Sequence, residues 1–298
     1  MPPAPLDAPG LRPVLDALGG EAFLVGGAVR NALVGEAPGD VDLSTPLDPD
    51  TVTRRLEAAG LKAVPTGLAH GTVTAVANGA GVEVTTFRTD VETDGRHAVV
   101  AFSRDMAEDA RRRDFTMNAL YADREGRVID PLGGLADLDA RRLRFIGDAR
   151  ARIREDYLRI LRFFRFSARY ADPACDLDAE SLAACAALAD GIERLARERI
   201  GHEMRRLLAA PDPRRAVAAM AGTGVLARCL SGTEPARLDA LVEAEARVGA
   251  APDWRVRLAA LAAGAGAAET GERLRLSKAE TRALETRARA RGALLAAA

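Results

Sequence analysis

The stretch AFLVGGAVRNALVGEAPGDVDL, residues 22–43, decides the fold. Its apolar start, residues 22–25, predicts a short buried strand. Gly26-Gly27 then allows a sharp turn in which the backbone comes close to a ligand, because glycine carries no Cβ. Residues 28–33 predict the first turns of a helix, whose free N–H groups favour an anion. Arg30 adds a fixed positive charge with a planar donor fork, so the sequence predicts an anion site at this turn.

Two carboxylates follow in the segment Asp40-Val41-Asp42-Leu43. The alternation predicts a strand that carries both carboxylates on one face, roughly 7 Å apart along the chain. Such a pair beside a phosphate-sized pocket suits a divalent metal held jointly by the protein and by nucleotide phosphates. A glycine pair alone is typical of an ordinary turn, and Asp-x-Asp alone of a solvated strand end. Their combination in this order favours a nucleotidyl-transfer site.

On these residues the sequence resembles the class II tRNA nucleotidyltransferase and bacterial poly(A) polymerase family. That family opens with a strand, Gly-Gly-x-Val-Arg-Asp and then Asp-x-Asp. This chain has Asn31 where the family usually has Asp, which removes one acidic neighbour of Arg30 and leaves both expected metal ligands in place. The resemblance implies an α+β fold, in which an N-terminal mixed-sheet nucleotidyltransferase head is followed by an all-α neck and body.

Composition sets the broad class. A chain of 298 residues is long enough for two or three domains with a buried core. It has no run of about 18 apolar residues and no charged-then-apolar signal pattern at its N-terminus, so we expect a soluble, cytoplasmic protein. The three cysteines, Cys175, Cys185 and Cys229, lack C-x-x-C spacing. They argue against a disulfide framework or a zinc site and are expected to be small buried residues.

The head is expected within residues 21–130. Residues 46–60 predict a helix capped by Asp48 or Asp50, and the β-branched segments 71–76 and 81–88 predict strands of a mixed sheet. Glu83 lies on one of these strands and could be a third carboxylate near the metals. A surface or strand-edge glutamate is the preferred interpretation, so we do not assign Glu83 to the site.

Residues 89–98 are polar and turn-rich, and they predict a loop with Asp94-Gly95 at its tip. In the resembled family a flexible loop at this place takes part in the switch from adding C to adding A. Its presence here disfavours a relative that adds only C.

Residues 108–120, EDARRRDFTMNAL, carry the second motif. Three arginines before an aspartate would ordinarily be a solvated helix end, but the string matches the family motif Arg-Arg-Asp-Phe-Thr-x-Asn-Ala. The resemblance implies that Arg113 contacts phosphate or ribose, that Asp114 reads the ribose 2′-hydroxyl, and that Asn118 belongs to the nucleotide-binding residues. A carboxylate that accepts from a hydroxyl would penalise the deoxy analogue. Residues 129–134 then match the family's Asp-Pro-x-Gly-Gly turn, which closes the head.

Residues 148–170 predict one long helix with a packed face and an arginine face. From Arg141 to Arg169 ten arginines stand against three acidic residues, although the formal net charge of the whole chain is -1. A solvated basic face is the ordinary interpretation of such a helix. The clustering is nevertheless what an electrostatic footprint for nucleic acid requires.

Within this helix Glu155-Asp156-Tyr157-Leu158-Arg159 matches the family's Glu-Asp-x-x-Arg motif. The family uses the Asp and Arg of this motif as an amino-acid template for the incoming base, which implies this role for Asp156 and Arg159. A carboxylate accepts from the exocyclic amine of C or A, and an arginine donates to a ring nitrogen or carbonyl. Arg162 and Arg165 would then lie along the triphosphate.

Residues 177–295 predict a string of helices, broken at proline- and glycine-containing segments. Several arginines here could reach an RNA backbone, but no RNA-binding residue is assigned. We expect three domains: residues 1–140 as the catalytic head, 141–205 as a helical neck and 206–298 as a helical, RNA-binding body. Family members usually continue into a helical tail, so the tail of this chain is expected to be short or missing.

The sequence thus predicts a metal-dependent RNA nucleotidyltransferase that adds C, C and A to tRNA 3′ ends from CTP and ATP and releases pyrophosphate. Asp40 and Asp42 would be the catalytic ligands of two Mg²⁺ ions, and Gly26, Gly27, Arg30 and Arg113 would orient the triphosphate. No membrane and no protein partner is implied.

Three alternatives stay open. The same motifs serve poly(A) addition and A-only addition, although residues 67–76 look more like the tRNA enzymes. A non-catalytic tRNA-binding protein is a rival from another class, against which the intact carboxylate pair argues. A small-molecule nucleotidyltransferase would share the head and leave the arginine-rich helix unexplained.

Overall fold

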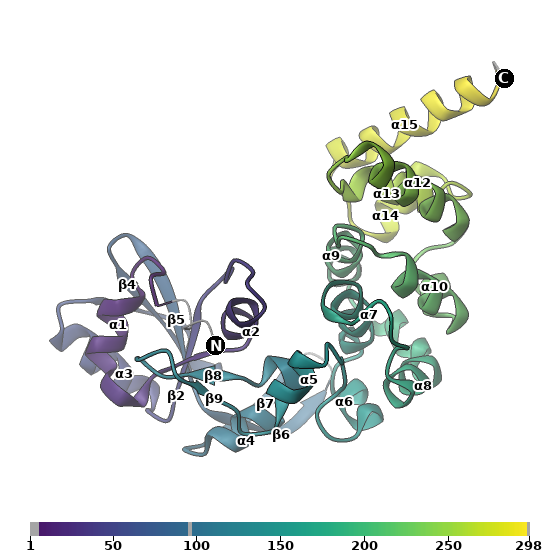
Figure 1. The fold of residues 1–298 in the computed structure, drawn as a ribbon. Helices are drawn as coiled ribbons and strands as arrows, with labels where there is room; N and C mark the ends of the chain where they lie inside the picture. Colours follow the sequence, from purple (N-terminus) through teal and green to yellow (C-terminus); the bar gives the residue numbers. More distant parts are fainter. Residues whose placement is uncertain (1–5, 95–96, 297–298) are drawn as a thin grey trace. The chain divides into compact units, whose positions relative to one another are not determined.

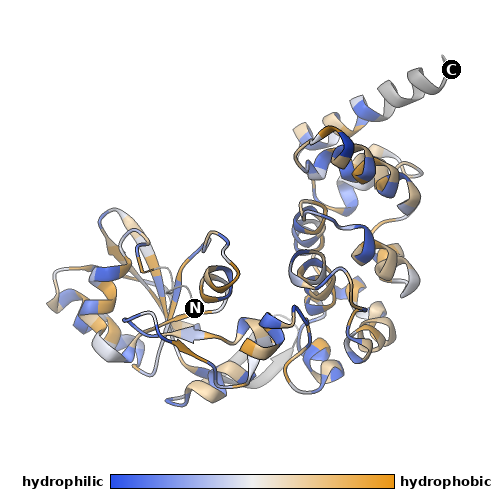
Figure 2. Ribbon diagram, in the orientation of Figure 1, coloured by the Kyte–Doolittle hydropathy of each residue, from blue (hydrophilic) through white to orange (hydrophobic). Residues whose placement is uncertain are grey.

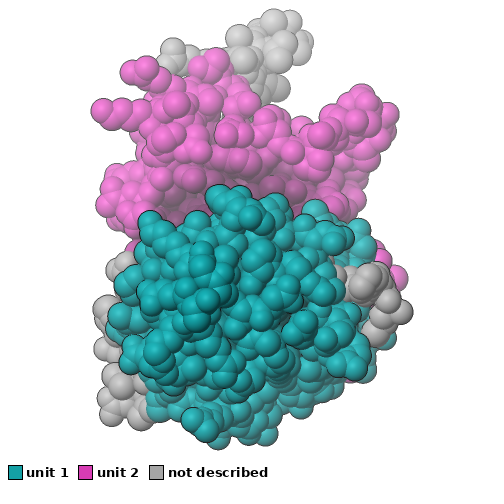
Figure 3. Space-filling model, turned by 90° about the vertical axis from the view of Figure 1, so that its left-hand side faces the viewer, with its two compact units in different colours: residues 1–140, 144–147 teal, residues 141–143, 148–298 magenta. Residues whose placement is uncertain are grey.

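The protein is described by a computed structural model over residues 6–94 and 97–296. The chain divides into two compact units. Unit 1 holds residues 1–140 and 144–147, and unit 2 holds residues 141–143 and 148–298 (Figure 3). The expected division of the helical part into a neck and a body at residue 205 stays a prediction.

Unit 1 is built on a seven-stranded mixed sheet, as the sequence predicts. Strands β2 and β5 pair in parallel and the other neighbours are antiparallel. In spatial order the strands are β3 (Lys62–Gly67), β4 (Thr72–Ala77), β5 (Ala80–Thr86), β2 (Asp42–Thr45), β1 (Phe23–Val25), β8 (Tyr121–Ala122) and β9 (Val128–Ile129).

Helices cover this sheet because its strands alternate between buried and more exposed residues. In β4, for example, Val73, Ala75 and Ala77 are buried. Helices α1 (Leu11–Leu18) and α3 (Pro49–Ala58) pack on each other and on β4 (Figure 1). Of the two expected caps, Asp48 is the one used, since its side chain accepts from the Thr51 N–H at 2.8 Å. The remaining helices of unit 1 are α2 (Gly27–Leu33), α4 (Met106–Arg111) and α5 (Gly134–Asp139).

The prediction of a loop at residues 89–98 is wrong. Strands β6 (Arg88–Asp94) and β7 (His97–Phe102) form a two-stranded antiparallel sheet, with an irregularity in register between Asp90 and Glu92. The apolar, β-branched run that begins at His97 supplies the second strand, and its partner precedes it directly in the sequence. The expected tip includes Gly95, which lies outside the described residues.

Unit 2 is all-helical, as expected. Its helices are α6 (Ala149–Glu155), α7 (Leu158–Tyr170), α8 (Ala179–Ala187), α9 (Arg197–Leu208), α10 (Arg214–Gly222), α11 (Val225–Cys229), α12 (Pro235–Val248), α13 (Trp254–Leu261), α14 (Ala267–Arg273) and α15 (Lys278–Ala296). Figure 2 shows hydrophilic and hydrophobic residues on the same helices, which is the amphipathic pattern of packed helices. Helix α7 packs against α9 and α10, and α12 packs against α13. Among the described helices, none has the length and apolar character needed to cross a membrane.

The segment expected as one helix over residues 148–170 is two helices, which is a second correction. Asp156 has an extended backbone, with φ -153° and ψ 107°, and separates α6 from α7. Its Oδ1 accepts from the Leu158 N–H at 3.0 Å. Aspartate competes for backbone donors in this way, which favours caps and turns over helix interiors. Both helices bury one apolar face, so the apolar periodicity of the sequence continues across the break and suggests a single helix.

Cysteine burial is predicted correctly at two of three positions. Cys185 and Cys229 are buried, and burial raises the pKa of both thiols. Cys175 is exposed, in the segment between α7 and α8. That segment runs over the surface, where a small residue gains no core contacts.

Candidate functional site

The turn between β1 and α2 is shaped by Gly26, whose φ of 69° lies in the region that favours glycine. Its N–H donates to the carbonyl of Leu120 at 3.0 Å. A Cβ built on Gly26 would lie 3.5 Å from Nη1 of Arg113, and one built on Gly27 would lie 3.6 Å from Nη2 of Arg30. The two arginines expected to bind a triphosphate therefore both lie against this turn.

Arg30 is buried and is held by two amide side chains. Its Nε and Nη2 donate to Oδ1 of Asn31 at 3.1 and 2.7 Å, and its Nη1 donates to Oδ1 of Asn118. Asn31 also donates through Nδ2 to the carbonyl of Ala37 at 3.0 Å. The residue that departs from the family pattern thus orients Arg30 and anchors the loop leading to the acidic segment, and an aspartate could not donate the second of these bonds.

The acidic segment differs from the expected geometry in one respect. Strand β2 begins at Asp42, so Asp40 lies just before the strand and follows Gly39, whose φ is 70°. Partial burial raises the pKa of the Asp42 carboxyl, and Glu83 and Asp40 raise it further, while Arg113 lowers it. Like charges are therefore gathered around Asp42.

Glu83 is the residue that the sequence interpretation left out. It is the partner of Asp42 across the parallel β2–β5 pair, and it contributes more than Asp40 to the raised pKa of Asp42. The sequence marks Glu83 as a strand residue. It contains no signal that β5, and not another strand, lies beside β2, because that pairing is nonlocal.

The carboxylate oxygens near the start of β2 suit a divalent cation. Carboxylate oxygens are the ligands that Mg²⁺ prefers, and Mg²⁺ is commonly bound by one or two carboxylates together with substrate phosphates. Within residues 6–94 and 97–296, no group of three or more His, Cys, Asp and Glu side chains is arranged to hold a metal ion by itself. Asp40 and Asp42 could hold a cation only together with ligands from elsewhere, such as phosphate oxygens or water.

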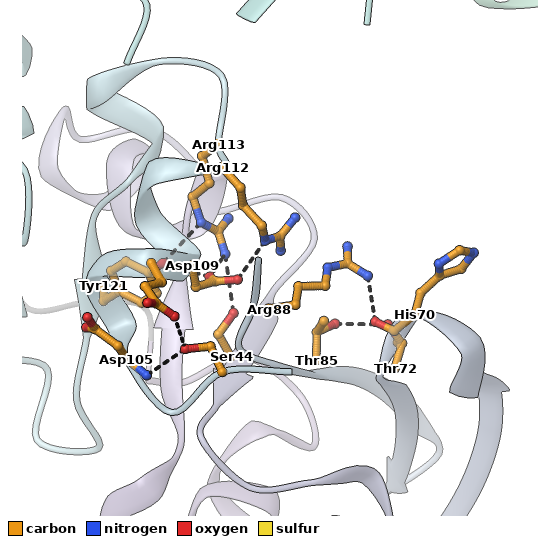
Figure 4. Close-up of polar contacts among 12 residues, drawn as sticks. Ser44, His70, Thr72, Thr85, Arg88, Asp105, Asp109, Arg112, Arg113 and Tyr121 are labelled. Atoms are coloured by element: carbon orange, nitrogen blue, oxygen red, sulfur yellow. Dashed lines mark hydrogen bonds and ion pairs between the residues drawn. The ribbon is translucent and has the colours of Figure 1, made fainter. Parts of the chain in front are cut away.

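Arg113 is positioned by a buried network centred on Asp109 (Figure 4). Oδ2 of Asp109, which is fully buried, accepts from Nη2 of Arg113 at 2.8 Å and from the Tyr121 hydroxyl at 2.7 Å. Oδ1 accepts from Nε of Arg112 at 2.8 Å. Arg113 also donates from Nε to the Tyr121 hydroxyl at 3.2 Å and from Nη2 to Oγ of Ser44 at 3.3 Å. Ser44 is two residues beyond Asp42 on β2, which places Arg113 on the face that carries the Asp42 carboxylate.

The ionised form of the Asp109 carboxyl is strongly favoured over the neutral form. Burial alone would raise the pKa of its carboxyl, but the neighbouring charges of Arg113 and Arg112, with the hydrogen bonds from Arg113 and Tyr121, lower that pKa to about 2. Burial together with the nearby Asp109 charge raises the pKa of the Tyr121 hydroxyl, so it stays a donor. At neutral pH the network is therefore an ionised carboxylate holding two guanidinium groups.

Asp114 and Asn118 join the two motifs of unit 1. Oδ1 of buried Asp114 accepts from Nδ2 of Asn118 at 2.9 Å and from the Phe115 N–H at 2.9 Å. Asn118 in turn accepts from Arg30, so a continuous chain of polar contacts runs from Asp114 to the glycine turn. The predicted residues of unit 1 thus lie around the glycine turn and the start of the central strand β2.

In unit 2 each predicted template residue contacts a charged partner of its own. Oδ2 of Asp156 pairs with Nη2 of Arg199 on α9 at 2.7 Å. Nη1 of Arg159 pairs with Oε2 of Glu155 at 2.5 Å and donates to the carbonyl of Arg152 at 2.9 Å. Asp156 and Arg159, on either side of the start of α7, are therefore each oriented by contacts of their own.

The prediction of an arginine face on α7 is wrong for Arg165. Arg165 is buried, its Nε lies 2.5 Å from Oε2 of Glu203 on α9, and its guanidinium lies 4.2 Å from the centre of the Phe166 ring. Burial lowers its pKa, against the opposing charge of Glu203. Arg162 stays partly exposed, with its guanidinium 5.2 Å from the Phe166 ring centre. Arg199 pairs with Asp156 and Glu203 pairs with Arg165. The sequence around Arg199 and Glu203 predicts only a charged helix, so it does not reveal these two contacts.

Two family models match the chain. The model of the poly(A) polymerase head domain matches residues 22–144, and the model of a probable RNA- and SrmB-binding site of polymerase A matches residues 176–237. The crystal structure of the Bacillus stearothermophilus CCA-adding enzyme in complex with CTP is 32% identical. It superposes with a TM-score of 0.67, over 96% of this chain and 68% of that one. The chain belongs to the CCA-adding enzyme and poly(A) polymerase family.

Two curated members of this family show the extent of the match. The mitochondrial CCA tRNA nucleotidyltransferase 1 of Mus musculus is 44% identical over 189 residues, which are 63% of this chain and 44% of that protein. The CCA-adding enzyme of Geobacillus thermodenitrificans is 42% identical over 209 residues, 70% of this chain and 50% of that protein. The chain thus spans about half the length of these relatives. The family and the fold class predicted from the sequence are confirmed.

Proposed function

We propose that the chain is a metal-dependent RNA nucleotidyltransferase that adds C, C and A to tRNA 3′ ends from CTP and ATP and releases pyrophosphate. The observation that carries the proposal is that Asp42, whose pKa is raised by Glu83 and Asp40, lies at the start of β2 close to Arg113, which with Arg30 lies against the glycine turn. The names of the family's curated members support tRNA as the acceptor, and the CTP complex of the bacterial relative supports CTP as a substrate.

Asp40 and Asp42 would hold Mg²⁺ with the help of nucleotide phosphates. When bound, the metal would help the tRNA 3′-hydroxyl lose its proton and stabilise the charge that develops on pyrophosphate. Glu83 raises the electrostatic cost of an uncompensated negative charge on Asp42. The repulsion among these carboxylates favours a bound cation beside Asp42.

The other residues of unit 1 would bind and orient the nucleotide. The backbone of Gly26 and Gly27 lets the triphosphate approach, and Arg30 and Arg113 supply guanidinium donors whose directions are fixed by amide and carboxylate partners. Asp114 would accept from the ribose 2′-hydroxyl, with its carboxylate held by Asn118.

Asp156 and Arg159 would select the base. A carboxylate accepts from the amine of C or A, whereas G and U present the wrong pattern of donors and acceptors. The pairs with Arg199 and Glu155 would keep the two side chains in the geometry that this selection needs. Arg162 and Arg165 stay proposed contacts of the triphosphate. For Arg165, contact requires that its guanidinium serve Glu203 and the ligand together.

Incorporation on three tRNA substrates, ending before CCA, after C and after CC, tests the proposal with all four labelled nucleotides. Ordered C, C, A followed by a stop supports it. A single A only on the CC-ended substrate would mean an A-adding enzyme, and an unending A tail would mean the poly(A) polymerase that shares the head-domain model. No incorporation with Mg²⁺ would indicate a tRNA-binding protein without catalysis.

Two variants locate the activity. Asp42→Asn should abolish incorporation without loss of folding, and Asp50→Asn, which alters an exposed acid of α3, is the matched control. Asp156→Ala should relax the choice of base more than it lowers triphosphate affinity. Substantial activity in Asp42→Asn would contradict the metal assignment, and unchanged selectivity in Asp156→Ala would remove the template role. The cytoplasmic location expected from the sequence stays a prediction.

A further inference from the structure

Unit 2 contains a cavity of about 690 Å³. It is formed by the end of α7, the start of α10, one face of α12 and the segments that join α7 to α8 and α9 to α10. None of the residues proposed to bind the incoming nucleotide lines it. Its volume lies in the range of about 300–1,000 Å³ that is usual for small-molecule sites.

The charges that line the cavity are separated. Four arginines and three carboxylates are present. Two of the carboxylates lie beside Arg214, whose guanidinium is 2.6 Å from Asp212 and 3.7 Å from Glu243. The other three arginines, Arg141, Arg169 and Arg215, outnumber the one remaining carboxylate, Asp239, so the rest of the charged lining is net positive. An anionic group is therefore favoured on the side away from Arg214.

Arg141 and Arg215 are both hydrogen-bonded to the backbone of Asp172. The Asp172 N–H donates to the carbonyl of Arg141 at 3.0 Å, and Nη1 of Arg215 donates to the carbonyl of Asp172 at 2.5 Å. Arg141 has a φ of 47°, a left-handed backbone that is uncommon for a residue with a side chain. The exposed Arg141 is thus held at the cavity by a strained turn, and strain of this kind is concentrated at functional sites.

Arg215 also carries an unmet donor. Its Nη2 is buried and has no hydrogen-bond partner within the part of the chain that the structure describes. A buried donor without an acceptor is destabilising, so the Arg215 guanidinium, which belongs to a residue that lines the cavity, would be stabilised by an added acceptor. Phosphate oxygens match the planar donor fork of arginine in both geometry and charge.

The rest of the lining indicates what else the ligand carries. Apolar side chains, among them Ala168, Pro173 and Leu177, line the cavity together with the arginines. They suit the flat face of a base or the carbon side of a ribose. Asp239 could accept from an amine or a hydroxyl of the same ligand.

We propose that this cavity is a second phosphate-binding site that takes a nucleotide, with the phosphate between Arg141 and Arg215 and the nucleoside against the apolar wall. The nucleotide is either free or the end of an RNA strand, since both present the same chemistry. The site does not depend on the proposed catalytic function, because its residues lie outside the nucleotidyl-transfer site.

Photolabelling with 8-azido-ATP in the presence of EDTA tests the site. Without divalent metal, binding of the triphosphate at the acidic edge of unit 1 is weakened, and mass spectrometry of the labelled peptides locates the probe. We expect label in peptides covering residues 167–177 and 211–243, which exclude the proposed base-selecting and triphosphate-binding residues 156–165. Label confined to unit 1 and residues 156–165 would overturn the proposal.

Three variants make the test specific. Arg215→Ala should lower the affinity for labelling about tenfold, as expected for the loss of a hydrogen bond to a charged group. Arg141→Gly removes a guanidinium while it favours the observed left-handed backbone, so a similar loss cannot be assigned to a weakened fold. Arg228→Ala, a partly exposed arginine of unit 2 outside the cavity, is the control and should label as the unaltered protein does. Undiminished labelling in both cavity variants would overturn the proposal.

Competition distinguishes the two sources of the nucleotide. Pyrophosphate should reduce the label in the cavity peptides, because it presents the phosphate chemistry alone. Displacement by ADP at lower concentration than by a short RNA assigns the site to free nucleotides, and the reverse order assigns it to an RNA end. Failure of pyrophosphate, ADP and RNA alike to displace the probe would contradict recognition of phosphate.

Discussion

Replacing Asp109 by Asn should destabilise unit 1 and weaken the proposed triphosphate site together. The carboxylate is fully buried and holds Arg112, Arg113 and the Tyr121 hydroxyl. The pKa of Asp109 is lowered from 3.8 to about 2 in the folded protein. That shift corresponds to about 2 kcal/mol of stability at neutral pH. An amide of the same shape keeps the volume but loses the charge, so we expect a loss of this size or larger.

The pH dependence separates charge from packing. The folded pKa of Asp109 lies below the unfolded one, so its ionic contribution is present above about pH 4 and is lost as the pH falls towards 2. Urea unfolding of the unaltered protein and of Asp109→Asn should therefore differ by about 2 kcal/mol at pH 7 and by about half of that at pH 3. Asp50→Asn is the control and should show no such convergence. An equal difference at both pH values would refute the electrostatic explanation.

Kinetics test the positioning of Arg113. With Asp109→Asn the guanidinium loses its anionic partner, and KM for the nucleotide should rise several-fold more than kcat falls, as expected for a lost ground-state contact. Tyr121→Phe removes a hydroxyl that bonds both residues and should change KM in the same direction by less. An unchanged KM in Asp109→Asn would mean that Arg113 does not bind the nucleotide or does not need this carboxylate.

Three further predictions follow from single contacts. Gly26→Ala should cost about 1–2 kcal/mol in urea unfolding, because its φ of 69° is unfavourable for a residue with a Cβ; an unchanged midpoint would contradict this. Asn31→Asp should speed amide hydrogen exchange in residues 34–39, since the substituted side chain cannot donate to that loop, and unaltered protection would remove the anchoring role. Arg199→Ala should raise misincorporation of G and U about tenfold through the freed Asp156, whereas Arg197→Ala on the same helix should not; equal fidelity in both would show that the ion pair is dispensable.

Local signals predict the elements of this fold well. Apolar residues 22–25 and the glycine pair define β1 and the turn into α2, and the proline- and glycine-containing segments after α9, α10, α11 and α13 lie between helices or overlap a helix end by one residue. These features depend on neighbours in sequence, which a single chain displays. The sequence limits the cap of α3 to Asp48 or Asp50, and the structure uses Asp48.

Nonlocal contacts are what the sequence does not reveal. Glu83 belongs with Asp42 only because β5 and β2 pair in parallel, and Arg165 is buried only because Glu203 arrives from α9. The break at Asp156 is obscured by a continuous apolar period on both sides of it. In each case a strand order or a helix contact decides the outcome, and several arrangements would satisfy the same local pattern.

Two ion pairs made by α9, one to α7 and one to the break just before α7, also restrict sliding of these helices. Asp156, in the break, pairs with Arg199, and Arg165 of α7 pairs with Glu203 further along α9. A displacement of one helix along the other by a single turn, about 5.4 Å, would part both pairs at once and leave Glu203 without its buried partner. The carboxylate proposed to select the base is therefore held in register by a second pair deep in the helix interface, so a substitution at that distant pair could alter fidelity without touching the nucleotide.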